Sequence, residues 1–189
     1  MLIQRLFSVL ATSLLLLGAT PAWADDYQDT IAVFRKAEES GKFFANAHGY
    51  AVFPTIGKGG IGIGGAYGRG RVYERGRLIG DTSMTQLSVG FQLGGQGFSQ
   101  VIFFESAAAL KAFTQGEYEF GAEASAVAIT LGASVKAGSG GAAVGASLDK
   151  NKAKVAGAYN NGMAIFTVVK GGLMYEAAIA GQKFKFSKR

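Results

Sequence analysis

The sequence predicts an α+β fold: a compact, mostly antiparallel sheet or barrel-like domain with N-terminal helices and one short central helix. Apolar residues recur at helical spacing near the N-terminus, whereas period-two alternation dominates after residue 49. Turn signals such as Asn-Gly separate the alternating runs. Of the 189 residues, 49% are hydrophobic and 29 are Gly, so the glycines belong to a folded core and not to a disordered chain.

The first 24 residues have the pattern of a signal peptide. Arg5 precedes an apolar run over residues 6–17, and small residues stand at Ala22 and Ala24. About twelve apolar residues are too few for a spanning helix, which needs about 20, although a retained membrane anchor stays the alternative. We therefore expect an exported protein that begins at Asp25 and is periplasmic, associated with the cell envelope, or secreted.

Residues 25–189 are expected to form one domain, with a helical segment at 25–48 and a β-rich body at 49–189. No fixed-period repeat or linker divides them. Removing Arg5 from the 19 basic residues leaves 18, against 13 acidic residues, so the expected mature net charge is +5. An exported basic protein favours anionic lipid headgroups or polysaccharides as partners, and we expect no nucleic acid.

The predicted N-terminal segment contains two helices. Asp26 is a candidate N-cap for the first, which is expected to end at Gly41, and a short second helix is expected over residues 43–48. Three apolar side chains of the first helix recur at helical spacing: Tyr27, Ile31 and Phe34.

The body is expected to contain seven or eight strands. Residues 83–93 alternate, with Leu87 on the apolar face and Gln86 on the polar face, which is typical of a half-buried strand. Residues 101–104 are continuously apolar and predict a strand buried on both faces. Asn161-Gly162 predicts a two-residue hairpin turn, because both positions need positive φ.

One short helix is expected between these strands. Ser106 is a candidate N-cap for a helix over residues 107–113, which would break before Gly116. Weaker hairpin signals lie at residues 149–151 and 171–172.

The glycine-rich stretch 57–68 contains the dinucleotide-binding spacing Gly-x-Gly-x-x-Gly twice. That spacing binds pyrophosphate only between a strand and the N-terminus of a helix, and no helical apolar period follows it here. From residue 60 to residue 70 every second residue is Gly except Ala66. We interpret the stretch as a strand with one nearly bare face, which another backbone or an aromatic ring can approach closely, and expect no cofactor.

Six segments in order resemble the SYLF domain family: HGYAVFP, GKGGIGIGGAYGRG, SVGFQLGGQ, VIFFESAAALKAF, GAEASAVA and NNGMAIFTVVKGG. The resemblance spans residues 43–186. It implies a phospholipid-binding, non-enzymatic domain with a compact, largely antiparallel β-structure and flanking helices. For the eukaryotic members of the family, the resemblance implies binding of phosphoinositides and actin. Because this sequence begins with a signal-peptide pattern, we expect actin not to be its partner.

The sequence offers little for catalysis or metal binding. His48 is the sole His, and no Gly-x-Ser-x-Gly elbow accompanies it, so we interpret it as a structural residue. There is no Cys and no run of alternating acids to ligate calcium. Glu117, Glu119 and Glu123 are expected to form a solvated rim, since like charges so spaced repel.

Two groups of residues are candidates for lipid binding. Arg holds phosphate through two parallel hydrogen bonds, and Tyr is common at membrane interfaces. The candidate headgroup contacts are Arg69, Arg71, Arg75, Arg77 and Lys58. The candidate membrane-facing apolar residues are Tyr27, Ile31, Phe34, Tyr67 and Tyr73. The alternatives are a solvated hairpin tip for the arginines and the core face of an ordinary helix for the helical residues.

The leading hypothesis is an exported, non-enzymatic phospholipid-binding domain that acts at a cell-envelope membrane surface. The alternative is a small outer-membrane β-barrel or structural envelope protein, suggested by the alternating strands, the glycines and the aromatic residues. The predicted helices interrupt the strand series of such a barrel.

Overall fold

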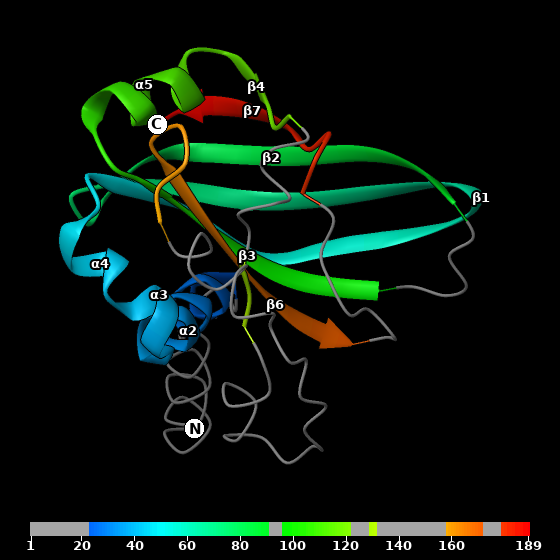
Figure 1. The fold of residues 1–189 in the computed structure, drawn as a ribbon, viewed down its shortest axis with the longest axis horizontal. Helices are drawn as coiled ribbons and strands as arrows, with labels where there is room; N and C mark the ends of the chain where they lie inside the picture. Colours follow the sequence, from blue (N-terminus) through cyan, green and yellow to red (C-terminus); the bar gives the residue numbers. More distant parts are fainter. Residues whose placement is uncertain (1–22, 91–95, 122–128, 132–157, 172–178) are drawn as a thin grey trace, which may run out of the picture.

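The structure is a computed structural model, and it describes residues 23–90, 96–121, 129–131, 158–171 and 179–189. The fold is of the α+β type (Figure 1). Along the chain, three helices precede the first strand, and a fourth helix lies between the third and fourth strands. The helices are α2 (Trp23–Lys36), α3 (Glu38–Gly41), α4 (Phe43–Asn46) and α5 (Ala107–Thr114). The strands are β1 (Gly49–Glu74), β2 (Arg77–Gly90), β3 (Gln96–Phe104), β4 (Glu117–Glu119), β5 (Ile129–Thr130), β6 (Met163–Gly171) and β7 (Lys183–Lys188).

The strands form one sheet with the order β4-β7-β2-β1-β3-β6-β5. Every pairing is antiparallel except that of β5 with β6. The sheet is strongly twisted: β3 and β6 run obliquely to β1 and β2 (Figure 1). The predicted fold class, mostly antiparallel with N-terminal helices and a short central helix, is confirmed.

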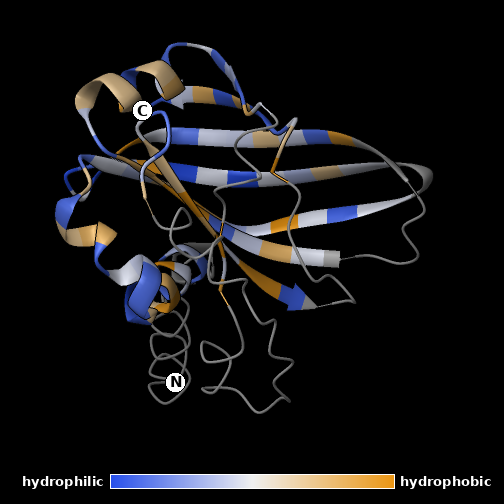
Figure 2. Ribbon diagram, in the orientation of Figure 1, coloured by the Kyte–Doolittle hydropathy of each residue, from blue (hydrophilic) through white to orange (hydrophobic). Residues whose placement is uncertain are grey.

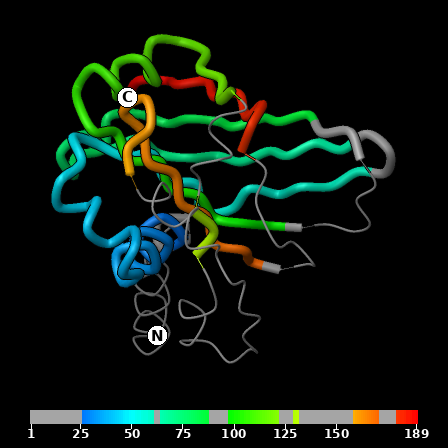
Figure 3. Tube along the Cα trace, viewed as in Figure 1, coloured from blue at the N-terminus to red at the C-terminus, as the bar shows by residue number. Residues whose placement is uncertain are grey.

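Strand β1 folds back on itself, so its two arms lie side by side (Figure 3). The first arm pairs with β3 from Gly49 onward, and the second arm pairs with β2 up to Glu74. A Cβ added to Gly68 would lie 2.6 Å from the side chain of Ile56. The chain therefore reverses direction between Ile56 and Gly68, within the glycine-rich stretch.

The bare face predicted for this stretch is occupied by side chains of the first arm. A Cβ on Gly70 would lie 2.6 Å from the ring of Phe53 and 2.9 Å from Thr82. The expectation that an aromatic ring approaches the glycines is confirmed at this position. The glycines are part of a strand, and the stretch leads into β2 and not into a helix.

The sheet has two faces, each with its own core. We call the inner face the one packed against α5, where Phe53, Ile102, Phe113 and Phe184 are buried together. The outer face is packed against α2 and α4 through Phe34 and Phe43, which are also buried. Hydrophobic colour runs along β6 and over α5, whereas β1 and β2 alternate between hydrophilic and hydrophobic residues (Figure 2).

The N-terminal helices differ from the sequence prediction in their boundaries. Helix α2 begins at Trp23, so Asp26 lies inside the helix and is not its N-cap. The helix ends at Lys36, and a break at Ala37 separates it from α3, which ends at Gly41 as expected. Ser40 is buried, and its hydroxyl donates a hydrogen bond to the Phe34 carbonyl oxygen at 2.5 Å.

The elements after β2 follow the predicted pattern. The Ser106 hydroxyl accepts a hydrogen bond from the Ala109 amide at 3.3 Å, which confirms Ser106 as the N-cap of α5. Residues 101–104 are fully buried in β3. Asn161 and Gly162 have φ of 49° and 75°, as a two-residue turn requires. The weaker hairpin signals at 149–151 and at Gly172 lie outside the described residues.

The orientation predicted for β2 is wrong. Gln86 is buried on the inner face, whereas Leu87 on the outer face is 85% exposed. The Gln86 side-chain amide donates a 2.7 Å hydrogen bond to the Ala180 carbonyl oxygen. The alternation of the sequence predicts which residues share a face of the strand, but it does not predict which face is buried. In the structure Gln86 lies on the buried face, where its side-chain amide is hydrogen-bonded.

No helix of the described residues is long and apolar enough to cross a membrane.

We expect G70A to destabilise the fold, because the added methyl group would overlap the Phe53 ring. The cost should be about 1–3 kcal/mol, typical of overpacking in a dense core. G57A is the control, since a Cβ at Gly57 meets nothing within 4 Å. Urea denaturation of both variants measures the difference. Equal stability of G70A and G57A would contradict the close packing of the two β1 arms.

Candidate functional site

On the outer face of β1, β2 and β7, side chains that are opposite one another in the strand register form rows across the sheet. Two of these rows lie where α2 and α4 do not cover the sheet. Register places Arg69 opposite Ser83, and Ser83 opposite Lys185 on the next strand. The neighbouring row contains Tyr67, Thr85 and Lys183. These two rows bring three cations from distant parts of the sequence onto one surface: Arg69, Lys183 and Lys185.

Arg69 and Tyr67 contact each other within the second arm of β1. The Arg69 Nε donates a 3.1 Å hydrogen bond to the Tyr67 hydroxyl oxygen, and both side chains are exposed. This hydrogen bond raises the pKa of Arg69, which stays charged. Tyr67 is 50% exposed and Leu87 is 85% exposed, and they are the exposed large hydrophobic residues of the described chain.

Arg71, two residues further along the arm, is held by the N-terminal helix. Its guanidinium lies 4.1 Å from the centre of the Tyr27 ring of α2, a cation–π contact. Burial raises the pKa of the Tyr27 hydroxyl above 10.0, and the Arg71 charge offsets part of that rise. Arg71 therefore contributes to the packing of α2 against the sheet.

Acidic residues balance some of the cations at the edges of this surface. Lys183 lies 3.4 Å from Glu119 of β4, and register places Glu117 opposite Lys185. Arg189 lies 2.6 Å from Asp81. Each of these pairs is solvent-exposed, so each contributes little to stability.

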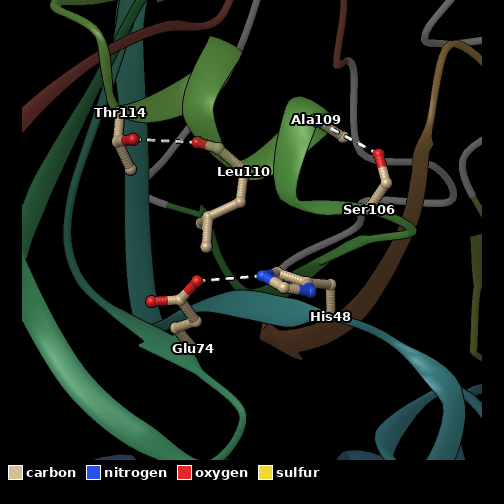
Figure 4. Close-up of polar contacts among 6 residues, drawn as sticks. All are labelled: His48, Glu74, Ser106, Ala109, Leu110 and Thr114. Atoms are coloured by element: carbon tan, nitrogen blue, oxygen red, sulfur yellow. Dashed lines mark hydrogen bonds and ion pairs between the residues drawn. The ribbon is translucent and has the colours of Figure 1, made fainter.

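His48 lies at the open end of the β1 hairpin, where the two arms terminate, next to α5 (Figure 4). Its Nε2 is 2.9 Å from Oε1 of Glu74, and its carbonyl oxygen accepts a 3.0 Å hydrogen bond from the Arg75 amide. These contacts join the two ends of β1. The described environment of the sole His is therefore that of a structural residue.

Comparison with protein families gives a match over residues 85–188, which run from β2 to β7. The matching family is described as Ysc84, Las17-binding protein actin regulator. This is the SYLF domain family, and the match covers more than half of the chain. The chain belongs to the SYLF family. The resemblance expected from the sequence is thus confirmed.

One curated relative is Beta cell expansion factor A of Aeromonas veronii. The two sequences are 28% identical over 160 residues, which cover 84% of this chain and 53% of the relative. The chain therefore spans about half the length of that protein. SYLF domains form a lipid-binding, non-enzymatic family and bind phospholipids in general.

Within this SYLF chain, the candidate headgroup residues are divided among four places. Arg69 lies on the exposed outer face, and the Arg71 guanidinium stacks on the Tyr27 ring of α2. Arg75 and Arg77 are exposed at the β1–β2 turn, where Arg75 has φ of 48°, about 20 Å along the strand from Arg69. Lys58 pairs with Gln96 on β3, and alternation from buried Ile56 places it on the inner face.

Most of the apolar residues expected to face a membrane are buried. Ile31 and Phe34 pack in the outer-face core, as the alternative of an ordinary helix predicted. Tyr73 is only 6% exposed and stacks on Tyr50 at 4.9 Å. Tyr27 is half-buried, and its ring stacks against the Arg71 guanidinium. In this fold Tyr67 alone of the five has a freely exposed side chain, because the helices cover the others.

Sequence reasoning missed three residues of this surface: Leu87, Lys183 and Lys185. The predicted orientation of β2 placed Leu87 in the core. The two lysines alternate with Phe184 and Phe186, a pattern that signals a strand with one basic face. Only the pairing of β7 with β2 shows that this basic face adjoins Arg69.

We expect the Arg71–Tyr27 contact to appear in a double-mutant cycle. R71Q and Y27L should each destabilise the protein, and their effects should be coupled by about 0.5–1 kcal/mol, as for a cation–π contact at a partly exposed site. Urea denaturation of the two single variants and the double variant measures the coupling. R77Q is the control, since Arg77 lies at the exposed turn, and its effect should add to that of Y27L. Additive effects of R71Q and Y27L would contradict this role of Arg71 in the packing of α2.

Proposed function

We propose that this protein is an exported, non-enzymatic SYLF domain that binds anionic phospholipid at a cell-envelope membrane surface. Membership of the SYLF family carries this proposal, since the match covers the strands from β2 to β7. The signal-peptide pattern supports export, and the expected mature net charge of +5 favours anionic lipid over neutral lipid.

The headgroup contacts are proposed to come from the arginines of the β1–β2 hairpin. Arg69 is exposed on the outer face, and Arg75 and Arg77 are exposed at the turn. Arg71 is partly exposed and contributes its charge from its position against α2. A guanidinium both attracts an anionic surface and forms two parallel hydrogen bonds to one phosphate. The proposed partner of these arginines is therefore anionic phospholipid, and not actin or nucleic acid.

The mature protein should float with vesicles that contain equal parts of phosphatidylglycerol and phosphatidylcholine. Binding should fall steeply as salt rises, because the attraction between surface charges is screened within a Debye length of about 8–10 Å. Vesicles of phosphatidylcholine alone are the control and should bind weakly. Absence of flotation with every anionic vesicle at low salt would overturn the proposed function.

Replacing Arg69, Arg71, Arg75 and Arg77 by Gln should weaken binding to the anionic vesicles at least tenfold. Each basic residue near an anionic surface contributes about 1 kcal/mol, and part of that is lost for a partly buried group. A matched control replaces four exposed cations on the helices by Gln: Arg35, Lys36, Lys42 and Lys111. If the two variants lose binding equally, net charge and not the hairpin governs affinity.

The exported form is expected to begin at Asp25. Cleavage there leaves residues 25–36 of α2, including the buried Ile31 and Phe34, so the fold retains its helical cover. Intact mass of the protein recovered outside the cytoplasm measures the start. A mass that still includes residues 1–24 would contradict processing by a signal peptidase.

A further inference from the structure

The uncovered part of the outer face combines apolar and basic side chains in one patch. Tyr67 and Leu87 are diagonal neighbours across the β1–β2 pair, because Tyr67 is opposite Thr85 and Leu87 is two residues further along β2. Diagonal neighbours on one face lie roughly 7–8 Å apart. The exposed large hydrophobic residues of the described chain therefore lie side by side.

Cations lie directly beside this apolar pair. Lys183 shares a row with Tyr67, and Arg69 shares the next row with Lys185. Ser83 and Thr85 between them are small, so the longer basic and apolar side chains extend beyond them. The acids Glu117 and Glu119 lie on β4, on the far side of β7 from the apolar pair.

We propose that this patch, formed by Tyr67, Leu87, Arg69, Lys183 and Lys185, is the surface that docks on an anionic bilayer. The inference rests on the proposed function and assigns it to one face of the sheet. Leu87 and Tyr67 enter the region between the headgroups and the acyl chains, where the Tyr ring is apolar and its hydroxyl stays hydrated. Arg69, Lys183 and Lys185 contact the phosphates around them.

The chemistry of the patch fits a bilayer surface better than a single bound headgroup. Its cations stand on two rows and on two strands, β1 and β7, that are separated by β2, and they do not converge on one point. Flexible Lys side chains extend their charges away from the sheet while their aliphatic stems cover it. An anionic surface satisfies all of these charges at once, and its apolar interior accepts Leu87, whose exposure in water is otherwise unfavourable.

A single fluorescent label tests the docking face directly. The chain has no Cys, so L87C labelled with an environment-sensitive dye reports from one known position. The label should shift to shorter wavelength and gain intensity when vesicles of equal parts phosphatidylglycerol and phosphatidylcholine are added. A108C is the control, because Ala108 is exposed on α5, on the opposite face of the sheet. Its label should not respond.

Charge variants provide a second test with matched controls. Replacing Arg69, Lys183 and Lys185 by Gln should weaken vesicle binding by at least about tenfold, given the contribution of each basic group at an anionic surface. Replacing Lys36, Lys42 and Lys111 by Gln removes the same formal charge from exposed positions in or next to the helices and should have a smaller effect. Replacing Glu117 and Glu119 by Gln should strengthen binding by roughly fivefold, because it removes repulsion at the edge of the patch.

Each result bears on one of the two proposals. If the unlabelled protein binds no anionic vesicle, both the proposed function and the proposed docking face are wrong. If the protein binds but the label at position 87 does not respond, or the label at position 108 responds instead, only the docking face is wrong. Equal losses in the two triple variants would also overturn it. So would a wild-type dimer that L87Q dissociates, since a second copy would then cover the patch.

Discussion

The close approach of the two β1 arms is the constraint on which the rest of the sheet depends. The first arm carries β3 and β6, and the second arm carries β2 and β7. The two halves pack closely where Gly68 and Gly70 leave room for Ile56 and Phe53. Any larger residue at these glycines would push the arms apart. At the other end, the contact of His48 with Glu74 closes the hairpin.

Elements governed by local interactions could be predicted from the sequence. The cap of α5 needs only Ser106 and the amide three residues later, and the Asn161-Gly162 turn needs only two residues with positive φ. The start of α2 was misplaced because Asp26 has the right side chain for a cap, but helical backbone begins before it at Trp23. A capping residue is a preference, and it does not by itself decide where a helix begins.

The direction in which β2 faces depends on partners far away in the sequence. On the inner face, the side-chain amides of Gln100 and Gln182 are fully buried and hydrogen-bond to each other at 2.9 and 3.1 Å. Gln86 reaches Ala180 in the same interior. A buried amide is stable only when it is paired, and an unpaired one would cost about 1–3 kcal/mol. The sequence shows the glutamines but not their pairing, so hydrophobicity alone assigned Leu87 to the wrong side.

The candidate site illustrates the same limit in another way. Tyr73, Arg71, Arg69 and Tyr67 share the outer face of one arm, yet their environments change from buried to exposed along it. Helix α2 covers the end near the turn, so identical alternation produces a core residue at Tyr73 and a surface residue at Tyr67. The arginines that are neighbours in sequence therefore act differently: Arg71 holds the helix, while Arg69 stays available. Its neighbours on the surface come instead from β2 and β7, because sheet register and not sequence proximity decides which charges an incoming membrane would meet together.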